Sequence, residues 1–373
     1  MKKRTGSILF VGGGSGGHLA PLVPVIEAVH HVAPKIELHY AGQGADLESP
    51  IICNVNVPLV LHRISAGKLN RFLTLKHLGE LAGFLKGCLQ SWLLVGRINP
   101  SLVFSKGGAV SVPLALAAAM RGIPIYAHES DVMPGMANRI VARLAKKVFV
   151  SYPVEAYSGT LPDEKLIWSG QPVREEFYQP DRNNPLILDG RTISDSLPLV
   201  VVVGGSQGGR KVNRLVQGAW NELLQKAHLV HICGQTDYLQ VMAAAEKLSG
   251  SDRQNLWLLP FVGAELPVLF QRSAIVISRA GGTIFELAAT RTPTVLIPLS
   301  TAAQNHQSKN AALVVGHGAA MAIDERTATP KELAKVALDL LDNEFRRHAL
   351  SEAIGFLSKP IAATEIAKAL INA

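Results

Sequence analysis

The sequence predicts an α/β protein built from two doubly wound parallel sheets, and three observations lead to this prediction. Short apolar runs rich in β-branched residues alternate with longer helical patterns, as in sheets whose strands are joined by helical crossovers. The alternation occurs in two series, separated by a stretch rich in proline, aspartate and asparagine. The length of 373 residues is more than one ordinary core needs and enough for two.

Each series supplies five predicted strands. The first series comprises residues 8–11, 36–40, 102–105, 123–128 and 147–151. The second comprises residues 199–203, 229–233, 256–259, 275–278 and 294–298. We therefore expect an N-terminal domain over residues 1–165, a linker region over 166–198 and a C-terminal domain over 199–352. A last helix, within residues 353–373, is expected to pack back on the N-terminal domain. A cleft between the carboxyl ends of the strands would bind ligands.

Composition excludes several classes of protein. Three cysteines far apart favour a reducing, cytoplasmic setting over a disulfide framework or a zinc site. The apolar run that ends at Gly12 is too short for a signal sequence, and residues 107–120 are too short to span a membrane. The net charge of +8 favours polyanionic partners: phosphorylated substrates, anionic lipid or nucleic acid.

Both predicted domains open with an apolar run followed by a glycine-rich turn, at residues 12–17 and 204–209. Such a turn lets backbone amides approach a phosphate at the start of a helix. A tight turn without a ligand is the alternative. Neither turn fits the dinucleotide fingerprint or the P-loop. His18 follows the first turn, where a neutral imidazole could act as a base, although the pattern by itself is more typical of a packing or capping histidine.

Several motifs then occur in one order along the chain. They are Gly12–Pro21, Phe104–Gly108, Val110–Pro113, His128–Asp131, Pro134–Asn138, Gly170–Arg174, Val203–Gly208, Ser278–Gly281 and Phe285–Glu286. Together they resemble the MurG family, the family 28 glycosyltransferases that convert lipid I to lipid II in peptidoglycan synthesis. The resemblance implies a GT-B fold. It also implies inverting transfer of N-acetylglucosamine from UDP-N-acetylglucosamine to the 4-hydroxyl of undecaprenyl-pyrophosphoryl-N-acetylmuramoyl pentapeptide.

The resemblance also assigns roles to residues, with His18 as the base. The residues that it places at the donor are Ser15, Gly16, Gly17, Asp131, Arg174, Ser206, Glu286 and Gln307. Those that it places at the acceptor and its diphosphate are Gly14, Gly107, Gly108 and Glu129. An arginine can pair with a diphosphate, and a carboxylate can accept hydrogen bonds from two ribose hydroxyls. Each of these residues also has a role without a ligand. Arg174 could be a solvated linker charge, Glu286 a helix N-terminal acid and Gln307 a solvated loop amide.

The sequence departs from the family pattern at three places. Asp131 stands where some members have an asparagine, and an acid accepts but cannot donate. The segment 279–286 is one residue shorter than the common pattern, and Ala109 occupies a position where an aromatic residue is frequent. We therefore expect the donor contacts of Asp131 and of segment 279–286 to differ from those of the family. The packing of the acceptor near Ala109 is expected to differ as well.

A helix over residues 71–95 is the candidate for membrane contact. We expect its core face to contain Leu75, Leu78, Ala82, Leu85, Leu89 and Trp92. The opposite, membrane-associating face would contain Leu73, Leu81 and Phe84 with Lys76 nearby. A helix buried on two sides is the alternative, supported by glycines at 79, 83 and 87. Lipid phosphates could meet a basic set comprising Lys106, Arg139, Arg143, Lys146 and Lys147.

The resemblance implies a peripheral enzyme at the cytoplasmic face of the bacterial membrane. Its partners would be UDP-N-acetylglucosamine, lipid I, an anionic membrane surface and cell-wall synthesis proteins, with no nucleic acid. No cofactor or metal is expected, because the sequence has no clear Asp-x-Asp pair. The rival functions are another GT-B glycolipid transferase, a UDP-N-acetylglucosamine 2-epimerase-like isomerase and a dinucleotide-dependent oxidoreductase.

Overall fold

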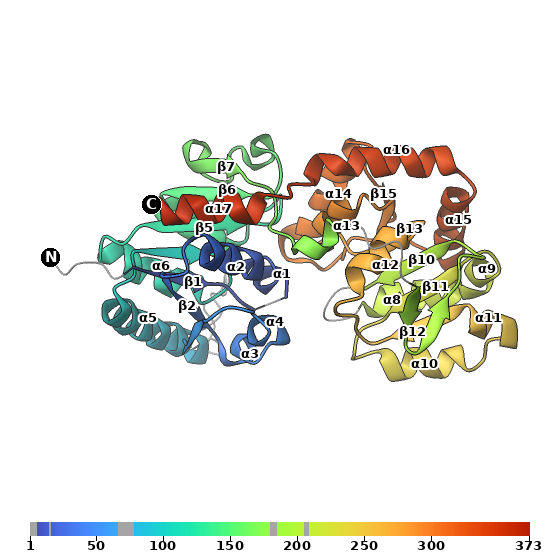
Figure 1. The fold of residues 1–373 in the computed structure, drawn as a ribbon, viewed down its shortest axis with the longest axis horizontal. Helices are drawn as coiled ribbons and strands as arrows, with labels where there is room; N and C mark the ends of the chain where they lie inside the picture. Colours follow the sequence, from blue (N-terminus) through green and yellow to red (C-terminus); the bar gives the residue numbers. More distant parts are fainter. Residues whose placement is uncertain (1–5, 15, 66–77, 180–184, 205–208) are drawn as a thin grey trace. The chain divides into compact units, whose positions relative to one another are not determined.

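A computed structural model describes residues 6–14, 16–65, 78–179, 185–204 and 209–373, without the side chains of 78–81. The chain forms two compact units (Figure 1). Unit 1 comprises Met1–Arg174 and Lys359–Ala373, and unit 2 comprises Glu175–Ser358. Each unit contains a parallel sheet with helices between its strands, which confirms the predicted fold class.

The sheet of unit 1 is parallel throughout and has the order β3-β2-β1-β4-β5-β6-β7. Its strands are β1 (Ser7–Val11), β2 (Glu37–Gly42), β3 (Val60–Arg63), β4 (Leu102–Ser105), β5 (Ile125–Glu129), β6 (Lys147–Val150) and β7 (Leu166–Trp168). The strand order reverses between β1 and β4, which pair in the register Val11 with Ser105. Ligands of doubly wound sheets bind at the carboxyl ends of the strands at such a reversal.

Helices cover both faces of this sheet. They are α1 (Gly16–Leu19), α2 (Leu22–Val32), α3 (Gly44–Leu47), α4 (Pro50–Cys53), α5 (Leu78–Ile98), α6 (Ser111–Met120), α7 (Met136–Leu144) and α17 (Ala362–Ile371). One core layer joins Phe10 and Phe104 of the strands to Val25 of α2. On the other face, α6 packs against both α5 and α7.

The last helix, α17, belongs to unit 1 although unit 2 precedes it in the sequence. It packs against α2, and Figure 1 shows the red α17 beside the blue α2. Ile366 and Leu370 of α17 are buried in the same core layer as Val25 of α2. The core of unit 1 is therefore built from both ends of the chain.

The sheet of unit 2 is also parallel and has the order β12-β11-β10-β13-β14-β15. Its strands are β10 (Leu199–Val203), β11 (His228–Ile232), β12 (Leu256–Leu259), β13 (Ile275–Ser278), β14 (Thr294–Leu296) and β15 (Met321–Ala322). The helices are α8 (Arg210–Gly218), α9 (Trp220–Leu224), α10 (Tyr238–Ala245), α11 (Gly250–Gln254), α12 (Leu266–Arg272), α13 (Thr283–Thr290), α14 (His306–Gly316), α15 (Pro330–Leu341) and α16 (Glu344–Ile354). The order reverses between β10 and β13, as it does between β1 and β4 in unit 1.

The predicted linker over residues 166–198 is wrong. Residues 166–168 form β7, which pairs with β6 at the edge of the first sheet. Unit 2 begins at Glu175, and β8 (Leu186–Leu188) with β9 (Arg191–Ile193) forms an antiparallel hairpin in it. The expected boundary at residue 353 also shifts, because the 3-10 turn Gly355–Leu357 packs against α13 of unit 2. Turn residues in this stretch connect short strands instead of forming one linker.

Candidate active site

The first glycine-rich turn is held by close contacts that only glycines permit. A Cβ on Gly13, whose φ is +154°, would lie 2.2 Å from Asp46 Oδ2. A Cβ on Gly108, whose φ is +91°, would lie 2.4 Å from the Gly13 carbonyl oxygen. The Tyr40 hydroxyl donates to the Gly12 carbonyl oxygen at 2.6 Å. The turn after β1 and the Gly107–Gly108 turn after β4 are therefore in direct backbone contact.

Asp46 in α3 already binds an amide of this turn. Its Oδ1 accepts a hydrogen bond from the Gly14 amide at 2.8 Å, and its Oδ2 accepts one from the Gln43 amide at 3.0 Å. The carboxylate is buried. The prediction of Gly14 as a diphosphate ligand needs correction, because a carboxylate occupies the position where its amide would meet a phosphate.

His18 lies in the one-turn helix α1 and is half-buried. Its Nδ1 lies 3.1 Å from the Gly13 carbonyl oxygen. Since a carbonyl only accepts, Nδ1 carries the proton and Nε2 is the basic nitrogen of the neutral ring. Burial and then the Lys106 charge lower the His18 pKa to about 4, while Asp131 and Asp46 oppose the shift. The His18 imidazole is therefore neutral at neutral pH.

Lys106 directly follows β4 and is only 1% exposed. Its Nζ donates to Ser130 Oγ at 2.5 Å, and that hydroxyl donates to Gln171 Oε1 at 2.7 Å. Burial lowers the Lys106 pKa to about 8, although Glu129 and Asp131 raise it. The expectation that Lys106 meets lipid phosphates at the surface is wrong, because the fold buries its side chain.

Glu129 ends β5 and is also buried. Its Oε1 accepts from the Asp131 amide at 2.8 Å, and its Oε2 accepts from Asn138 Nδ2 at 2.7 Å. Burial and then the Asp131 charge raise the Glu129 pKa. A Cβ on Gly107 would lie 2.7 Å from Asn138 Oδ1. The Glu129 carboxyl therefore supports the Gly107 turn from inside through Asn138.

The structure gathers most predicted residues of unit 1 at the carboxyl ends of three neighbouring strands. They follow or end β1, β4 and β5: Gly14, Gly16, Gly17, His18, Gly107, Gly108, Glu129 and Asp131. Ser15 lies outside the described residues, and Arg174 is the last residue of the first segment of unit 1. Sequence reasoning missed Asp46, Asn138 and the buried position of Lys106. Asn138 ends the motif Pro134–Asn138, whereas nothing in the sequence distinguishes Asp46 from a surface acid.

In unit 2, a buried ion pair occupies the corresponding end of the sheet. Arg279 directly follows β13, and its Nη2 donates to Glu325 Oε1 at 2.6 Å. Its Nη1 donates to the Ile297 carbonyl at 3.1 Å. Ser300 donates to Glu325 Oε2 from its amide at 2.8 Å and its hydroxyl at 2.6 Å. Burial alone would raise the Glu325 pKa, but hydrogen bonds from Ser300 and Arg279 outweigh burial and lower it.

The predicted donor residues of unit 2 lie beside this pair. Gln307 Oε1 accepts from the Leu299 amide at 2.9 Å, and its Nε2 would lie 3.9 Å from a Cβ on Gly281. Glu286 is half-buried in the first turn of α13. Ser206 lies outside the described residues.

The loop before Gln307 contains two consecutive non-glycine residues in the left-handed region. Gln304 has φ +54° and Asn305 has φ +57°. Such conformations cost free energy and cluster at functional sites. The strain therefore marks this loop as part of a candidate site.

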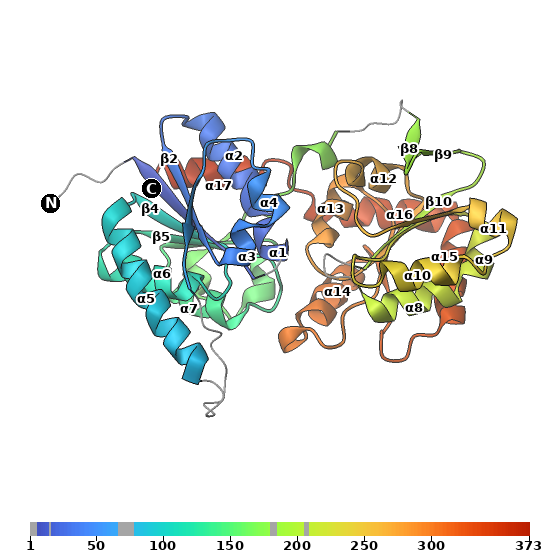
Figure 2. The ribbon, with the colours of Figure 1, turned by 90° about the horizontal axis from the view of Figure 1, so that it is seen from below.

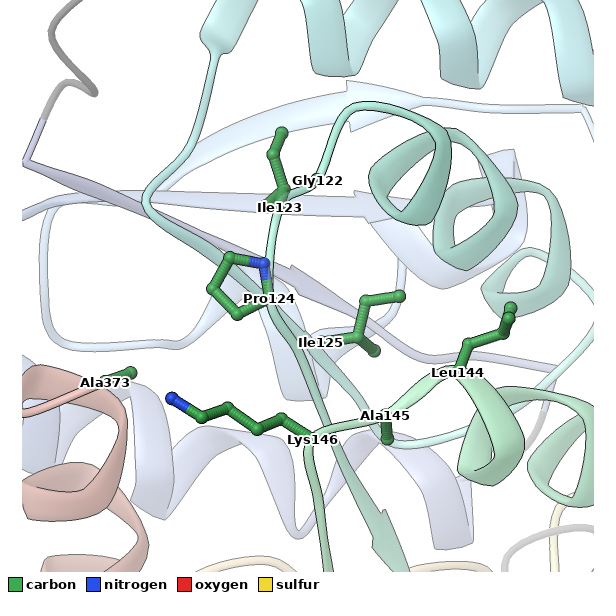
Figure 3. Close-up of a pocket in the computed structure, with 8 residues that line it drawn as sticks. All are labelled: Gly122, Ile123, Pro124, Ile125, Leu144, Ala145, Lys146 and Ala373. Carbon is green, nitrogen blue, oxygen red and sulfur yellow. The ribbon is translucent and has the colours of Figure 1, made fainter.

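A cavity of about 440 Å³ in unit 1 lies away from these groups (Figure 3). Its lining includes Ile125 at the start of β5 and Lys146 just before β6, so it lies at the amino ends of these strands. The Lys146 side chain extends toward Ala373. The cavity is therefore separate from the candidate site at the carboxyl ends.

The long helix α5 runs along the outer side of α6 (Figure 2). Its buried face contains Gly87, Ser91, Leu94 and Val95. A Cβ on Gly87 would lie 2.2 Å from the Ser65 carbonyl oxygen. The small residues let the helix backbone approach its neighbours, so the larger side chains are left on the opposite face.

That opposite face carries an exposed leucine stripe, defined as Leu85, Leu89 and Leu93. These side chains are 60%, 61% and 61% exposed and lie four residues apart. Trp92 beside them is 38% exposed and is stacked under the Arg121 guanidinium at 3.8 Å. The stripe is an exposed apolar feature of the kind that marks an interaction surface.

The predicted assignment of the two faces of α5 is therefore wrong. Leu85, Leu89 and Trp92 were expected in the core, but they are exposed because Gly87 and Ser91 form the packed face. Of the predicted membrane residues, Phe84 is half-buried. The others fall outside what the structure describes: Leu73, Lys76 and the side chain of Leu81. In the basic set, Arg143, Lys146 and Lys147 are exposed.

In the described part of the chain, no helix is both long and apolar enough to span a membrane. Across the same residues, no three histidine, cysteine, aspartate or glutamate side chains gather as metal ligands.

Two family models match the chain. The glycosyltransferase family 28 N-terminal domain matches residues 8–150, and the family 28 C-terminal domain matches residues 199–366. A Bacillus cereus relative is 35% identical over 355 residues, covering 94% of this chain and 95% of the relative. Its name is UDP-N-acetylglucosamine–N-acetylmuramyl-(pentapeptide) pyrophosphoryl-undecaprenol N-acetylglucosamine transferase 2.

Solved structures share the fold over nearly the whole chain. The crystal structure of Acinetobacter baumannii MurG superposes with a TM-score of 0.73 at 22% identity and covers 98% of both chains. The UDP-GlcNAc 2-epimerase of Neisseria meningitidis, bound to UDP-GlcNAc, gives a TM-score of 0.68 at 12% identity and covers 98% of this chain and all of the epimerase chain. At these identities, the likeness establishes a common two-domain architecture and no particular reaction.

Proposed function

The chain belongs to glycosyltransferase family 28, and from this premise we propose that it transfers N-acetylglucosamine from UDP-N-acetylglucosamine to lipid I, forming lipid II. The family models and the Bacillus cereus relative support the assignment. The observation in the site that carries it is His18. Its Nδ1 donates to the Gly13 carbonyl, so the neutral ring presents Nε2 as a base at the end of the first sheet.

The reaction needs one proton acceptor and no covalent intermediate. The 4-hydroxyl oxygen of the N-acetylmuramoyl group attacks C1 of the donor sugar, and the bond from C1 to the UDP oxygen breaks. The proton of the hydroxyl passes to His18 Nε2, and UDP leaves with the bonding electron pair. Attack opposite the leaving group inverts C1. A positioned base of this kind contributes about 100- to 10,000-fold to a rate.

Unit 2 supplies the donor contacts in this proposal. Glu286 accepts hydrogen bonds from the ribose hydroxyls, and the Gln307 amide contacts the donor sugar. The Leu299 amide already holds Gln307 Oε1, which leaves Nε2 to act as the donor in that contact. The strained pair Gln304 and Asn305 supports this placement, since they lie in the same loop. Ser206 of this unit would bind the diphosphate of UDP, together with Arg174 at the end of the first segment of unit 1.

Unit 1 supplies the base and the acceptor contacts. The amides of Gly16 and Gly17 open α1 beside His18, and the turn at Gly107 and Gly108 touches the first glycine turn. Gly14 contributes through its backbone conformation, with φ +85°, and not as an amide ligand, because Asp46 accepts from its amide. Asp131 lies close enough to His18 to stabilise the imidazolium formed when the proton is transferred.

We further propose that the leucine stripe of α5 brings the enzyme to the membrane that holds lipid I. Three exposed leucines on one helix face, with Lys86 and Arg97 exposed on the same helix, suit an anionic interface. The combined Leu85→Ser, Leu89→Ser and Leu93→Ser variant should lose flotation with phosphatidylglycerol vesicles. Leu239→Ser, at an exposed leucine of unit 2, is the control. Equal flotation of both variants would remove the stripe from this role.

Transfer of labelled N-acetylglucosamine to a soluble lipid I analogue tests the central proposal. Purified protein with UDP-N-acetylglucosamine should convert the analogue into a disaccharide product, with release of one UDP for each sugar transferred. A diacylglycerol acceptor should remain unmodified. Formation of UDP-N-acetylmannosamine without an acceptor would identify an epimerase instead, and glycosylation of diacylglycerol alone would identify another glycolipid transferase.

A further inference from the structure

The environment of Lys106 gives this residue a part in the proposed reaction that the family resemblance does not assign. It directly follows β4 and lies under the first glycine turn: a Cβ on Gly12 would lie 3.1 Å from Lys106 Cβ and 3.5 Å from the His18 carbonyl oxygen. Lys106 and His18 therefore both lie beside Gly12. A buried ammonium is costly unless its neighbours compensate for the lost hydration.

The neighbours of Lys106 fix its ammonium in one place. Ser130 accepts a hydrogen bond from Nζ, and Gln171 in turn accepts from the Ser130 hydroxyl. Glu129 and Asp131 follow on the adjacent strand β5 and its loop, and both favour the charged form of Lys106. The charge therefore cannot swing away into solvent as a surface lysine would.

The charged groups that act on His18 come from three elements. Lys106 after β4 disfavours the imidazolium, whereas Asp131 after β5 and Asp46 of α3 favour it. The Gly13 carbonyl also favours it through its hydrogen bond. Both substrates of the proposed reaction bear a diphosphate, which would add negative charge and favour protonation of the base further.

We propose that Lys106 is a positioning residue whose buried ammonium adds to the burial of the ring in keeping His18 unprotonated, so that His18 can accept a proton while two diphosphate substrates are bound. This inference rests on the proposed role of His18 as the base. Lys106 touches neither reacting atom; it acts through the electrostatic potential at the imidazole. Asp131 balances it by stabilising the imidazolium once the proton has moved.

The test follows the titration of the His18 imidazole by NMR in the full-length protein without substrate. The resonance is assigned by its loss in His18→Asn. Lys106→Gln removes the charge but can still donate to Ser130, and Lys106→Met removes both. In each variant the titration midpoint of His18 should rise by about one pH unit or more. Lys146→Met, at an exposed lysine of the same unit, should leave the midpoint unchanged.

The transferase assay provides a second measurement. The acid limb of kcat/KM should move to higher pH in Lys106→Gln by the same amount as the His18 midpoint. An unchanged midpoint in a folded Lys106→Gln protein would overturn the inference, even if turnover fell, because the lysine would then have only a structural role. Absence of transfer by the wild-type protein, with the midpoint shift present, would instead overturn the proposed function.

Discussion

Units 1 and 2 place a cation at the same point of the same topology. Lys106 directly follows β4 and Arg279 directly follows β13, the strands that pair with β1 and β10 across the reversal in strand order. Each cation lies beside a glycine that follows the neighbouring strand, Gly12 after β1 in unit 1 and Gly209 after β10 in unit 2. Lys106 Cβ is 3.1 Å from a Cβ position on Gly12, and Arg279 Nε is 3.5 Å from one on Gly209. The two sites therefore differ in chemistry and not in placement.

The surroundings of the two cations differ in one respect that matters for function. Arg279 has a fixed ionic partner, Glu325, whose pKa is lowered by hydrogen bonds despite its burial. Lys106 donates to a neutral hydroxyl, and its own pKa is lowered while that of Glu129 is raised. Unit 2 thus holds a permanent charge pair, which suits binding. Unit 1 holds charges near their titration range, which suits proton transfer.

The largest expected effect tests whether proton transfer belongs to unit 1. His18→Ala should reduce turnover about 100- to 10,000-fold, because the acceptor hydroxyl loses its base. UDP binding measured by calorimetry should stay unchanged, since the proposed nucleotide contacts are made by other residues, Arg174, Ser206 and Glu286. Wild-type turnover in this variant would show that His18 is not the base. The assignment of proton transfer to unit 1 would then fail as well.

The second test asks whether the ion pair of Arg279 and Glu325 in unit 2 stays charged in the folded protein. Arg279→Met should destabilise unit 2 by about 3–5 kcal/mol, because it leaves the Glu325 carboxylate buried without its cation. Hydrogen exchange of the β13 amides measures the change in that unit alone. The matched Lys106→Met variant should cost unit 1 less, since Glu129 can take up a proton when the ammonium is lost. Equal losses would contradict the expected compensation by Glu129.

The third test examines donor binding in unit 2. Glu286→Ala should weaken UDP binding about 30- to 150-fold, or about 2–3 kcal/mol, through loss of the hydrogen bonds that the ribose hydroxyls donate to a charged acceptor. Glu286→Gln, which still accepts one hydrogen bond, should show a smaller loss. If UDP affinity is retained and acceptor affinity falls, the ribose assignment is wrong.

The smallest expected effect is a change in the stability of unit 2 with pH. It tests a histidine whose pKa is lowered by burial without a neighbouring charge. Burial alone lowers the pKa of His231 in β11 to about 3, whereas His18 also responds to Lys106. A folded-state pKa below the unfolded value gives stability that is present above about pH 6.5 and is lost as pH falls toward 3. As pH falls from 7 to 5, protonation of His231 in the unfolded state should lower the free energy of unfolding of unit 2 by about 1–2 kcal/mol.

Exchange of the β11 amides in wild type and in His231→Gln measures this pH dependence. The variant should be less stable at pH 7, because His231 Nε2 lies 3.0 Å from Asn213 Oδ1 in the core, but its stability should vary less with pH. An equally steep pH dependence in both proteins would show that other groups in unit 2 cause it.

The sequence predicted the inner strands of both sheets because their apolar runs are buried on both faces. β1, β4, β10 and β13 lie within one residue of the predicted ranges. The edge strands β3, β7 and β15 were missed, since strands of two to four residues with exposed positions have no clear pattern. Edge strands gain stability from pairing and not from their own composition.

The parts of the candidate site that depend on local backbone geometry could be predicted from the sequence. The parts that depend on burial by distant segments could not. The glycine turns and His18 follow from local sequence, because a tight turn after a strand needs glycine. Lys106 resembles a surface lysine in the sequence, and only the packing of β4 beneath the Gly12 turn buries it. The face of α5 was misassigned because the apolar periodicity of a helix does not reveal that small residues form its packed side.

The position of α17 has a consequence for how the protein is made. Ile366 and Leu370 complete the core of unit 1, whose other residues include Ile8 and Val25 near the start of the chain. A ribosome therefore synthesises all of unit 2 before the first sheet can receive its last helix. Unit 2, whose residues are continuous from Glu175 to Ser358, can fold during translation. The N-terminal unit is expected to reach its final stability second, and a truncated or stalled chain should expose its incomplete core to proteases.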